Sequence, residues 1–388
     1  MSEARLIRAD HSPAFLAPEG TLKRLPRRPG LSRPPEFFAQ FEDRALAYDC
    51  FWHADGARIL IVGPPPMNLM PAWRAATYAA LPSGTRLAPV FHVSLSTMIT
   101  ELSGAPPGTT AVRLTVAEQS FELAVQPNHA ADFAGRKVLF TMSKDNDLAW
   151  IAEWARWHQR LHGTDAVVLF DNGSSRYGTG EIENTLLGVP GIDKVVVLRW
   201  PYAYGMTDPA LRVNPFYILF LQVSSMSVAL RRFAPAAAGL LNCDIDELVS
   251  TPSGTTIYEL CERSRQGLVA MRGRFMEAEA DAGVAAGQRT HRHYTSYLAD
   301  PKRAASRPSK WILDPRRPWV RSLAVHPYMH WIERRPWFAK TMPTDVFYRH
   351  FRGINTNWKQ PRTQARHASP DELVQDAEFA RLVIADAF

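Results

Sequence analysis

A strand–helix–strand pattern between residues 137 and 171 constrains the fold of this chain most strongly. Residues 137–142 and 166–170 are two short apolar runs that are typical of buried strands. Between them, apolar residues recur at helical spacing over residues 147–162. Two strands joined by one such helix run in the same direction, because the helix carries the chain back to the end of the sheet at which the first strand began. The pattern therefore predicts a mainly parallel sheet with flanking helices in an α/β fold.

The rest of the chain divides around this pattern. Apolar runs at 194–198 and 239–243 predict further buried strands, and residues 213–233 predict a long helix. Residues 38–134 instead contain segments that alternate apolar and polar residues, which indicates hairpins with one buried face. We therefore predict a basic, proline-rich arm, a small β-rich accessory domain, an α/β domain and a C-terminal helical tail, at residues 1–37, 38–134, 135–362 and 363–388.

Composition indicates which kinds of ligand the protein could bind and in which compartment it is expected. The chain has 45 lysines and arginines against 38 acidic residues, a formal charge of +7 that suits anionic ligands but is too mild to indicate nucleic acid. Proline and charge predict that the arm is solvated, with docking on an anionic membrane as the alternative. Three cysteines without a disulfide or zinc spacing indicate a reducing compartment. We expect a cytoplasmic protein, with peripheral contact of the arm at the inner membrane left open.

Polar clusters follow three of the predicted strands, at residues 143–147, 171–174 and 244–247. The carboxyl ends of parallel strands meet at one edge of the sheet, which is where ligands bind in open α/β folds. Alternation in a β-like segment would aim the carboxylates of Asp244 and Asp246 the same way. Two hard oxygen ligands suit Mg²⁺ or Mn²⁺ on a diphosphate. The alternative is a capped strand end with solvated carboxylates.

Together these segments resemble bacterial glycosyltransferases of the GT-A fold, similar to glycosyltransferase families 2 and 92. The matching motifs are Glu153-Trp154, Asp171-Asn172-Gly173-Ser174 and Asp244-Ile245-Asp246-Glu247. The first family motif differs, because Lys144-Asp145-Asn146 stands where the family has Lys-Asn-Glu. The resemblance covers roughly residues 136–360. It implies a GT-A core that transfers a sugar from a nucleotide sugar, most often a UDP-sugar, to a surface-polysaccharide acceptor such as a capsule glycan, with inversion.

The resemblance also implies roles for single residues. Asp244 and Asp246 would meet the donor diphosphate, at least one of them through Mn²⁺ or Mg²⁺. His326 would be a late metal ligand, because the Lys310 to His326 stretch is similar to the family's Lys-x-Ile…His segment; a packed histidine is the equal alternative. The remaining donor-side candidates are Thr141, Lys144, Asp145, Asp171, Asn172, Gln222, Lys310, His350 and Arg352, the last two of which could serve the acceptor instead.

An inverting transferase needs a carboxylate that deprotonates the acceptor hydroxyl. Glu277, after the strand-like residues 267–271, is the first candidate, and Glu247 is its competitor. Either could instead be a solvated surface residue. Two other functions stay open. A sugar nucleotidyltransferase would usually show a glycine-rich loop after its first strand, which is not apparent near Ser143. A non-catalytic glycan-binding protein on the same fold would bind glycans without needing a metal.

Overall fold

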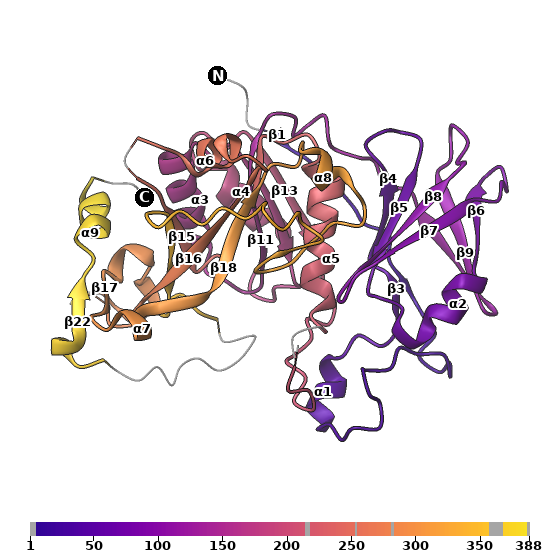
Figure 1. Cartoon of the computed structure of the whole chain (residues 1–388), viewed down its shortest axis with the longest axis horizontal. Coiled ribbons are helices and arrows are strands. Elements are labelled where there is room, and N and C mark those ends of the chain that lie inside the picture. Colours follow the sequence, from indigo (N-terminus) through magenta and orange to yellow (C-terminus); the bar gives the residue numbers. More distant parts are fainter. Residues whose placement is uncertain (1–4, 214–217, 253, 281–282, 357–367, 386–388) are drawn as a thin grey trace.

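A large mixed sheet forms the centre of the molecule (Figure 1). The computed structural model describes residues 5–213, 218–252, 254–280, 283–356 and 368–385. Within these ranges, nine strands pair in the order β1-β13-β12-β11-β14-β18-β16-β21-β15. Most neighbours are parallel, but β18 runs antiparallel to β14 and β16, and β15 antiparallel to β21. The strands are Arg5–Leu6 (β1), Lys137–Ser143 (β11), Ala166–Asp171 (β12), Lys194–Arg199 (β13), Gly239–Asn242 (β14), Glu247–Ser250 (β15), Leu268–Met276 (β16), Ala305–Leu313 (β18) and Phe347–Phe351 (β21).

The predicted strand–helix–strand unit is confirmed. Helix α3 (Leu148–His162) connects β11 to the parallel strand β12, and α4 (Thr179–Leu187) connects β12 to β13. Gly163, with φ of +67°, ends α3 in the left-handed conformation that glycine adopts without strain. Trp154 and Trp157 lie on α3 and are fully buried, as their amphipathic pattern predicts. The chain therefore has the predicted α/β fold with a mostly parallel central sheet.

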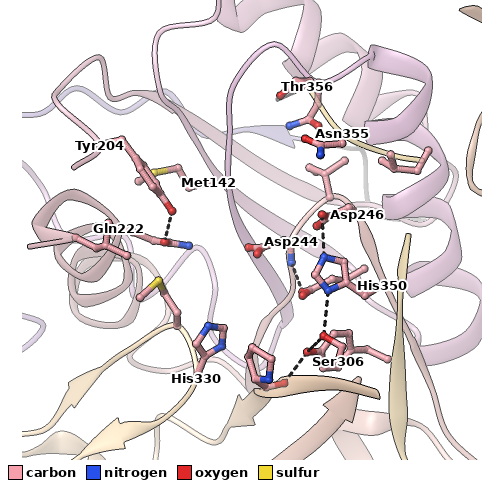
Figure 2. A pocket seen from close by; sticks show the side chains of 18 of the residues that line it. Met142, Tyr204, Gln222, Asp244, Asp246, Ser306, His330, His350, Asn355 and Thr356 are labelled. Carbon is pink, nitrogen blue, oxygen red and sulfur yellow. Dashed lines mark hydrogen bonds and ion pairs between the residues drawn. The ribbon is translucent and has the colours of Figure 1, made fainter. Parts of the chain in front are cut away.

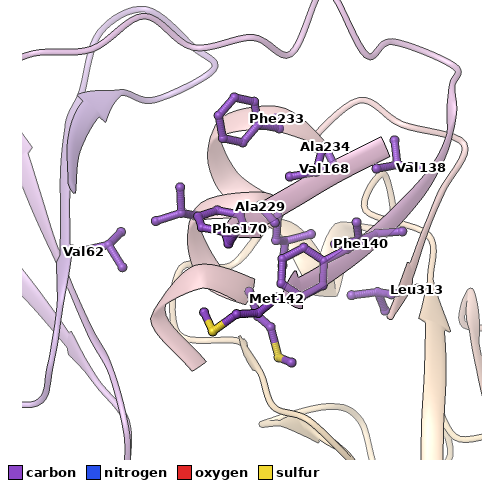
Figure 3. Close-up of a cluster of buried hydrophobic side chains, with 14 of the residues drawn as sticks. Val62, Val138, Phe140, Met142, Val168, Phe170, Ala229, Phe233, Ala234 and Leu313 are labelled. Atoms are coloured by element: carbon purple, nitrogen blue, oxygen red, sulfur yellow. The ribbon is translucent and has the colours of Figure 1, made fainter. Parts of the chain in front are cut away.

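Alternate residues of the parallel strands pack into two hydrophobic cores, one on each face of the sheet. Leu139 and Leu169 contribute to the core under α3. Phe140 and Phe170 contribute to the opposite core, which α5 (Phe220–Val228) covers (Figure 3). Helix α5 continues into a π-helical turn at Ala229–Phe233. The helix predicted over residues 213–233 therefore ends as predicted but begins later, at Phe220, because Leu219 has a non-helical ψ of 56°; residues 214–217 lie outside the described residues.

Two antiparallel sheets from the N-terminal third lie on the far side of α5 (Figure 1). We call them the N-terminal sheets. Val62 of β5 joins the same core as α5, so the four-stranded one of these sheets shares a hydrophobic core with the central sheet (Figure 3). Strands β9 and β10 pair as a hairpin of the kind that the alternating segments predict. The strands are Asp49–Trp52 (β4), Ile59–Gly63 (β5), Ala88–Val93 (β7) and Met98–Ser103 (β8) in one sheet, and Thr77–Leu81 (β6), Ala111–Val116 (β9) and Gln119–Ala124 (β10) in the other.

The expectation that the N-terminal arm is solvated is wrong for the residues that contact the rest of the protein. Residues Arg5–Leu6 pair with β13 as an edge strand of the central sheet. Arg24 is buried and donates to the backbone carbonyls of Pro65, Glu42 and Ala45. Arg33 is also buried and forms an ion pair of 3.0 Å with Asp208. Prolines leave carbonyls without partners in regular structure, and these guanidinium groups satisfy some of them.

The remaining elements are short and lie around the central sheet or, like α2 and β3, beside the N-terminal sheets (Figure 1). None of the described helices is both long enough and apolar enough to cross a membrane. The boundary predicted between residues 362 and 363 lies outside the described residues. The remaining helices and strands are Ala14–Phe15 (β2), Pro35–Gln40 (α1), Ala45–Ala47 (β3), Met70–Ala75 (α2), Ile257–Arg263 (α6), Ser296–Leu298 (β17), Pro301–Ala304 (α7), Pro318–Arg321 (α8), His326–Pro327 (β19), Ile332–Glu333 (β20), Leu373–Gln375 (β22) and Ala377–Ile384 (α9).

Candidate functional site

A pocket of about 390 Å³ opens where β11 and β14 end. This volume lies in the range that small-molecule sites occupy. Figure 2 shows Tyr204 and Gln222 on one side of the pocket and Asp246 and His350 on the other, with Asp244 between them. The pocket therefore occupies the edge of the sheet at which the sequence predicts a ligand site, and it has one uncharged polar wall and one charged wall.

A buried lysine holds two of the pocket carboxylates. Lys310, on β18, is 1% exposed, and its Nζ lies 2.8 Å from Asp244 Oδ2 and 3.1 Å from Glu247 Oε2. Glu247 is itself buried and accepts a hydrogen bond of 2.9 Å from the backbone N–H of Asp244. The antiparallel pairing of β14 with β18 brings the lysine to these residues across 63 positions of sequence, from Glu247 to Lys310. Lys310 therefore fixes the orientation of both carboxylates.

Burial and charge shift the pKa values in this cluster. Burial raises the pKa of Glu247 to about 7; the Lys310 ammonium opposes this shift and the Asp244 carboxylate adds to it. Burial alone would lower the pKa of Lys310, but the Asp244 and Glu247 carboxylates outweigh it and raise that pKa well above its ordinary value, so the lysine stays charged. Among the described residues, one ammonium thus pairs with two of the three pocket carboxylates.

The third carboxylate starts a chain of polar contacts along the charged wall. Asp246 Oδ2 lies 3.1 Å from His350 Nε2, and His350 Nδ1 lies 3.1 Å from Ser306 Oγ (Figure 2). The hydroxyl of Ser306 is in turn 3.2 Å from that of Tyr348. The antiparallel register of β15 and β21 pairs Glu247 with His350, which explains how residues a hundred positions apart meet. The chain Asp246–His350–Ser306 therefore depends on sheet register rather than on sequence spacing.

Three of these side chains could hold a metal ion. The ligand atoms of Asp246, Glu247 and His350 all lie within 4.8 Å of one another. Carboxylate oxygens suit Mg²⁺ and Mn²⁺, and an imidazole nitrogen shifts the preference toward Mn²⁺. This group differs from the predicted set of Asp244, Asp246 and His326. Strand β14 ends at Asn242, so Asp244 and Asp246 lie in a turn and face different partners, Lys310 and His350.

His326 lies elsewhere, on β19, and is not one of the residues that line the pocket. It is fully buried, and neither ring nitrogen has a hydrogen-bond partner among the described residues. Burial, with the nearby Arg231 and Arg334 cations, lowers the pKa of His326 to about 3, so the ring is neutral. The structure therefore places His326 as a packed histidine, the alternative that the sequence left open.

The donor-side candidates separate into those that line the pocket and those that do not. Gln222 lines the pocket and accepts a hydrogen bond of 2.6 Å from the hydroxyl of Tyr204. His350 and Asp244 also line it. Thr141 is fully buried within β11, and Lys144 contributes its backbone carbonyl, which accepts from Thr356 Oγ1 at 3.4 Å. The structure therefore brings together only part of the set that the resemblance implies.

Asp145, Asp171 and Asn172 shape the loops beside the pocket. Asp145, at a φ of +53°, accepts from the backbone N–H of Ser175 at 2.7 Å. Asp171 accepts from the N–H and hydroxyl of Ser174, and burial raises its pKa while these hydrogen bonds oppose the shift. The side-chain amide of Asn172 donates to the carbonyls of Trp200 and Tyr202. These polar groups satisfy loop backbone and are not among the pocket-lining residues.

Glu277 and Arg352 form a second ion pair, outside the pocket lining. Arg352 Nε lies 3.2 Å from Glu277 Oε1, and its guanidinium lies 3.8 Å from the centre of the Phe275 ring. Burial raises the pKa of Glu277, and the Arg352 cation opposes that shift. Of the two glutamates predicted as the base, Glu247 therefore lines the pocket and Glu277 does not.

Several pocket residues have no counterpart in the sequence prediction. Tyr204 lies in the segment that follows β13, a strand parallel to β12. Because ligands bind at the carboxyl ends of parallel strands, the polar residues after β13 could have been predicted as part of the site. Ser306, His330 and Asn355 come from a strand and loops whose position depends on long-range pairing. No motif or spacing in the sequence joins these three residues.

No protein-family model matches this chain, and no curated protein matches it at a significant level. A function for the protein must therefore be argued from the chemistry of the pocket. Its distinguishing feature is a group of carboxylates and an imidazole that outnumbers the one described ammonium in contact with it.

Proposed function

We propose that this protein is a glycosyltransferase with a GT-A-like core, preceded by an accessory β domain. It would move a sugar from a nucleotide-sugar donor, such as a UDP-sugar, to a glycan acceptor in surface-polysaccharide synthesis. One observation carries the proposal. The pocket at the carboxyl end of the sheet presents the carboxylates of Asp244, Asp246 and Glu247, and Lys310 is the one ammonium paired with this group among the described residues. These carboxylates repel a diphosphate unless a cation lies between the carboxylates and the diphosphate. Metal-assisted sugar transfer requires a cation in that position.

The residues present fit a divalent cation. Asp246 and His350 would hold it, because their ligand atoms lie close together and face the pocket. Mn²⁺ suits this mixed oxygen and nitrogen set better than Mg²⁺. When bound, the cation supplies positive charge for the leaving nucleoside diphosphate. Lys310 keeps Asp244 and Glu247 oriented toward the same site.

Glu247 is the proton acceptor in this proposal. The acceptor hydroxyl oxygen bonds to the anomeric carbon, the bond from that carbon to the diphosphate breaks, and the hydroxyl proton moves to the Glu247 carboxylate. A carboxylate whose pKa is raised to about 7 is a stronger base than an ordinary glutamate. Glu277 has a structural role in this proposal. It pairs with Arg352, directly after β21, and so helps to position the end of that strand. Gln222 and Tyr204 offer neutral hydrogen-bonding groups to sugar or ribose hydroxyls.

Isothermal titration with nucleoside diphosphates and nucleotide sugars, with Mn²⁺ and with chelator, tests the proposal. Wild-type protein should bind one nucleotide only when metal is present. Asp246→Asn and His350→Gln should lose this binding, whereas Glu247→Gln should keep it and lose sugar transfer. Glu277→Gln is the matched control and should retain both to within a few fold. No nucleotide binding under any condition would contradict the proposal and favour a non-catalytic glycan-binding protein.

A second candidate function follows from the Asp246–His350–Ser306 chain. A serine, a histidine and a carboxylate in hydrogen-bonding sequence is the arrangement of a nucleophile, its base and an orienting acid. An ester hydrolase would use Ser306 as the nucleophile. Ser306→Ala distinguishes the two functions: it would abolish hydrolysis of an activated ester and labelling by a phosphonate, but it should leave metal-dependent nucleotide binding intact.

A further inference from the structure

Residues 331–340 form an exposed segment that combines aromatic and basic side chains, and we call it the basic–aromatic loop. Trp337 is 88% exposed, Phe338 48% and Trp331 43%. The rings of Trp337 and Phe338 pack edge to face, with centroids 5.3 Å apart, and so form one apolar projection. Water contact with aromatic surface of this size is unfavourable, and exposed aromatic patches commonly mark interaction sites.

Unpaired cations surround this projection. Arg334, Arg335 and Lys340 belong to the loop, where Glu333 is the single acidic residue. Within the described ranges, none of these three cations lies in an ion pair with a carboxylate, and the same holds for the neighbouring Arg265 and Arg272. Every one of these groups would gain from a nearby anion.

The cations also lie close to one another. The guanidinium of Arg265 lies 5.7 Å from the centre of the Phe338 ring. Burial lowers the pKa of Lys340, and the positive charges of Arg335 and Arg272 lower it further. Positive charges this close together, with no carboxylate paired to them among the described residues, repel one another in the free protein. An anionic surface would offset that repulsion.

We propose that the basic–aromatic loop docks the protein on an anionic phospholipid membrane. Tryptophan and phenylalanine partition into the interfacial layer of a bilayer, and arginine and lysine pair with anionic headgroups. Charge complementarity therefore identifies the occupant. The loop suits this contact better than the N-terminal arm does, because Arg24 and Arg33 of the arm are buried against the protein itself.

The loop also connects the membrane contact with the pocket. Trp331 lines the pocket and stacks on Tyr328, with ring centroids 4.5 Å apart and 11° between the planes. Docking through the loop would therefore place the pocket close to the bilayer. The membrane contact does not depend on the reaction proposed above, because none of Trp337, Arg334 and Arg335 belongs to the pocket.

Vesicle flotation with the full chain tests the proposal. Wild-type protein should bind vesicles of phosphatidylcholine with about a third phosphatidylglycerol, and bind pure phosphatidylcholine much less. The Arg334→Gln/Arg335→Gln variant should bind the anionic vesicles about thirtyfold more weakly, and high salt should have the same direction of effect. Trp337→Ser/Phe338→Ser should weaken binding at every salt concentration. Brominated lipids should quench part of the tryptophan fluorescence, and Trp337→Phe should remove that part.

Matched controls use exposed residues elsewhere. Phe38, 54% exposed, provides the aromatic control as Phe38→Ser, and Arg27→Gln/Arg28→Gln provides the basic control in the arm. Thermal unfolding verifies that all variants fold. Equal vesicle binding by the loop variants and wild type would overturn the proposal, as would absence of binding to anionic vesicles. Trp337-dependent binding of a polysaccharide without vesicle binding would replace the membrane by a glycan and would likewise overturn it.

Discussion

Buried charge is arranged differently at two places in this molecule. Where the N-terminal sheets meet α5, Arg232 and Asp49 are both completely buried and pair one to one, with 2.9 Å between Nη1 and Oδ2. In the pocket, Lys310 pairs with both Asp244 and Glu247, and Asp246 pairs with His350. The first arrangement is balanced and satisfies its own charges. Among the described residues, the second places three carboxylates near one ammonium, an arrangement that suits a cationic ligand.

The comparison shows which buried charges serve the fold and which point to a ligand. Desolvation of a charge costs several kcal/mol, and a partner in good geometry offsets that cost. Asp49 also accepts hydrogen bonds from the backbone N–H groups of Ser12 and Cys50, so its pair with Arg232 joins three separate segments. A pocket that holds three carboxylates close together is expected to be less favourable for stability than a balanced pair, and to favour binding of a cation. Four measurements test this distinction.

Removal of the balanced pair should have the largest effect on stability. Arg232→Met leaves Asp49 buried without its cation, so the free energy of unfolding should fall by about 3–5 kcal/mol. Urea unfolding measures the change. Arg113→Met is the control, because its pair with Glu122 is exposed and should contribute about 1 kcal/mol or less. Equal losses in the two variants would show that burial does not distinguish these pairs.

Removal of a pocket carboxylate should instead affect function. Asp246→Asn should reduce Mn²⁺-dependent turnover by about a hundredfold or more, because it removes a preorganised charge from the site. Its free energy of unfolding should change by only about 1 kcal/mol, since His350 keeps Ser306 as a partner. Asp147→Asn, in the exposed loop before α3, is the control for both measurements. A loss of stability as large as that of Arg232→Met would contradict the comparison.

The pH dependence of the free energy of unfolding should reveal the raised pKa of Glu247. The pKa of Glu247 is raised in the folded protein, so its contribution to stability is complete below the unfolded pKa of 4.5 and is lost as pH rises through about 7. Glu247→Gln should remove that loss, so the variant should gain about 2–3 kcal/mol on wild type between pH 4.5 and pH 8. Lys310 keeps Asp244 as its partner in the variant. Urea unfolding across this pH range would disprove the shift if the difference stayed constant.

His326 should show the opposite dependence with a smaller effect. The pKa of this ring is lowered to about 3, so its contribution is present above the unfolded pKa of 6.5 and is lost as pH falls toward 3. At pH 5, the loss should be about 2 kcal/mol, and His326→Leu should not show it. Manganese affinity should stay unchanged in this variant. A weakened affinity would return His326 to the metal site that the sequence predicted.

The sequence determined the local structure and much of the site. Apolar periodicity located β11, α3 and β12, because burial of one face imposes a repeat on neighbouring residues. The acidic residues at 244–247 were found for a related reason. Polar residues directly after a buried strand have few other places to lie than the carboxyl edge of the sheet.

Only the tertiary structure decided which residues meet at that edge. His350 joins Asp246 because β21 pairs with β15 in one register, and a shift of one residue would turn the imidazole to the other face of the sheet. His326, the histidine that the motif resemblance favoured, lies instead on β19 in the core. Lys310 reaches Asp244 through β18. Local periodicity specifies which face of a strand is apolar, but the choice of partner strand depends on packing that spans a hundred residues of chain.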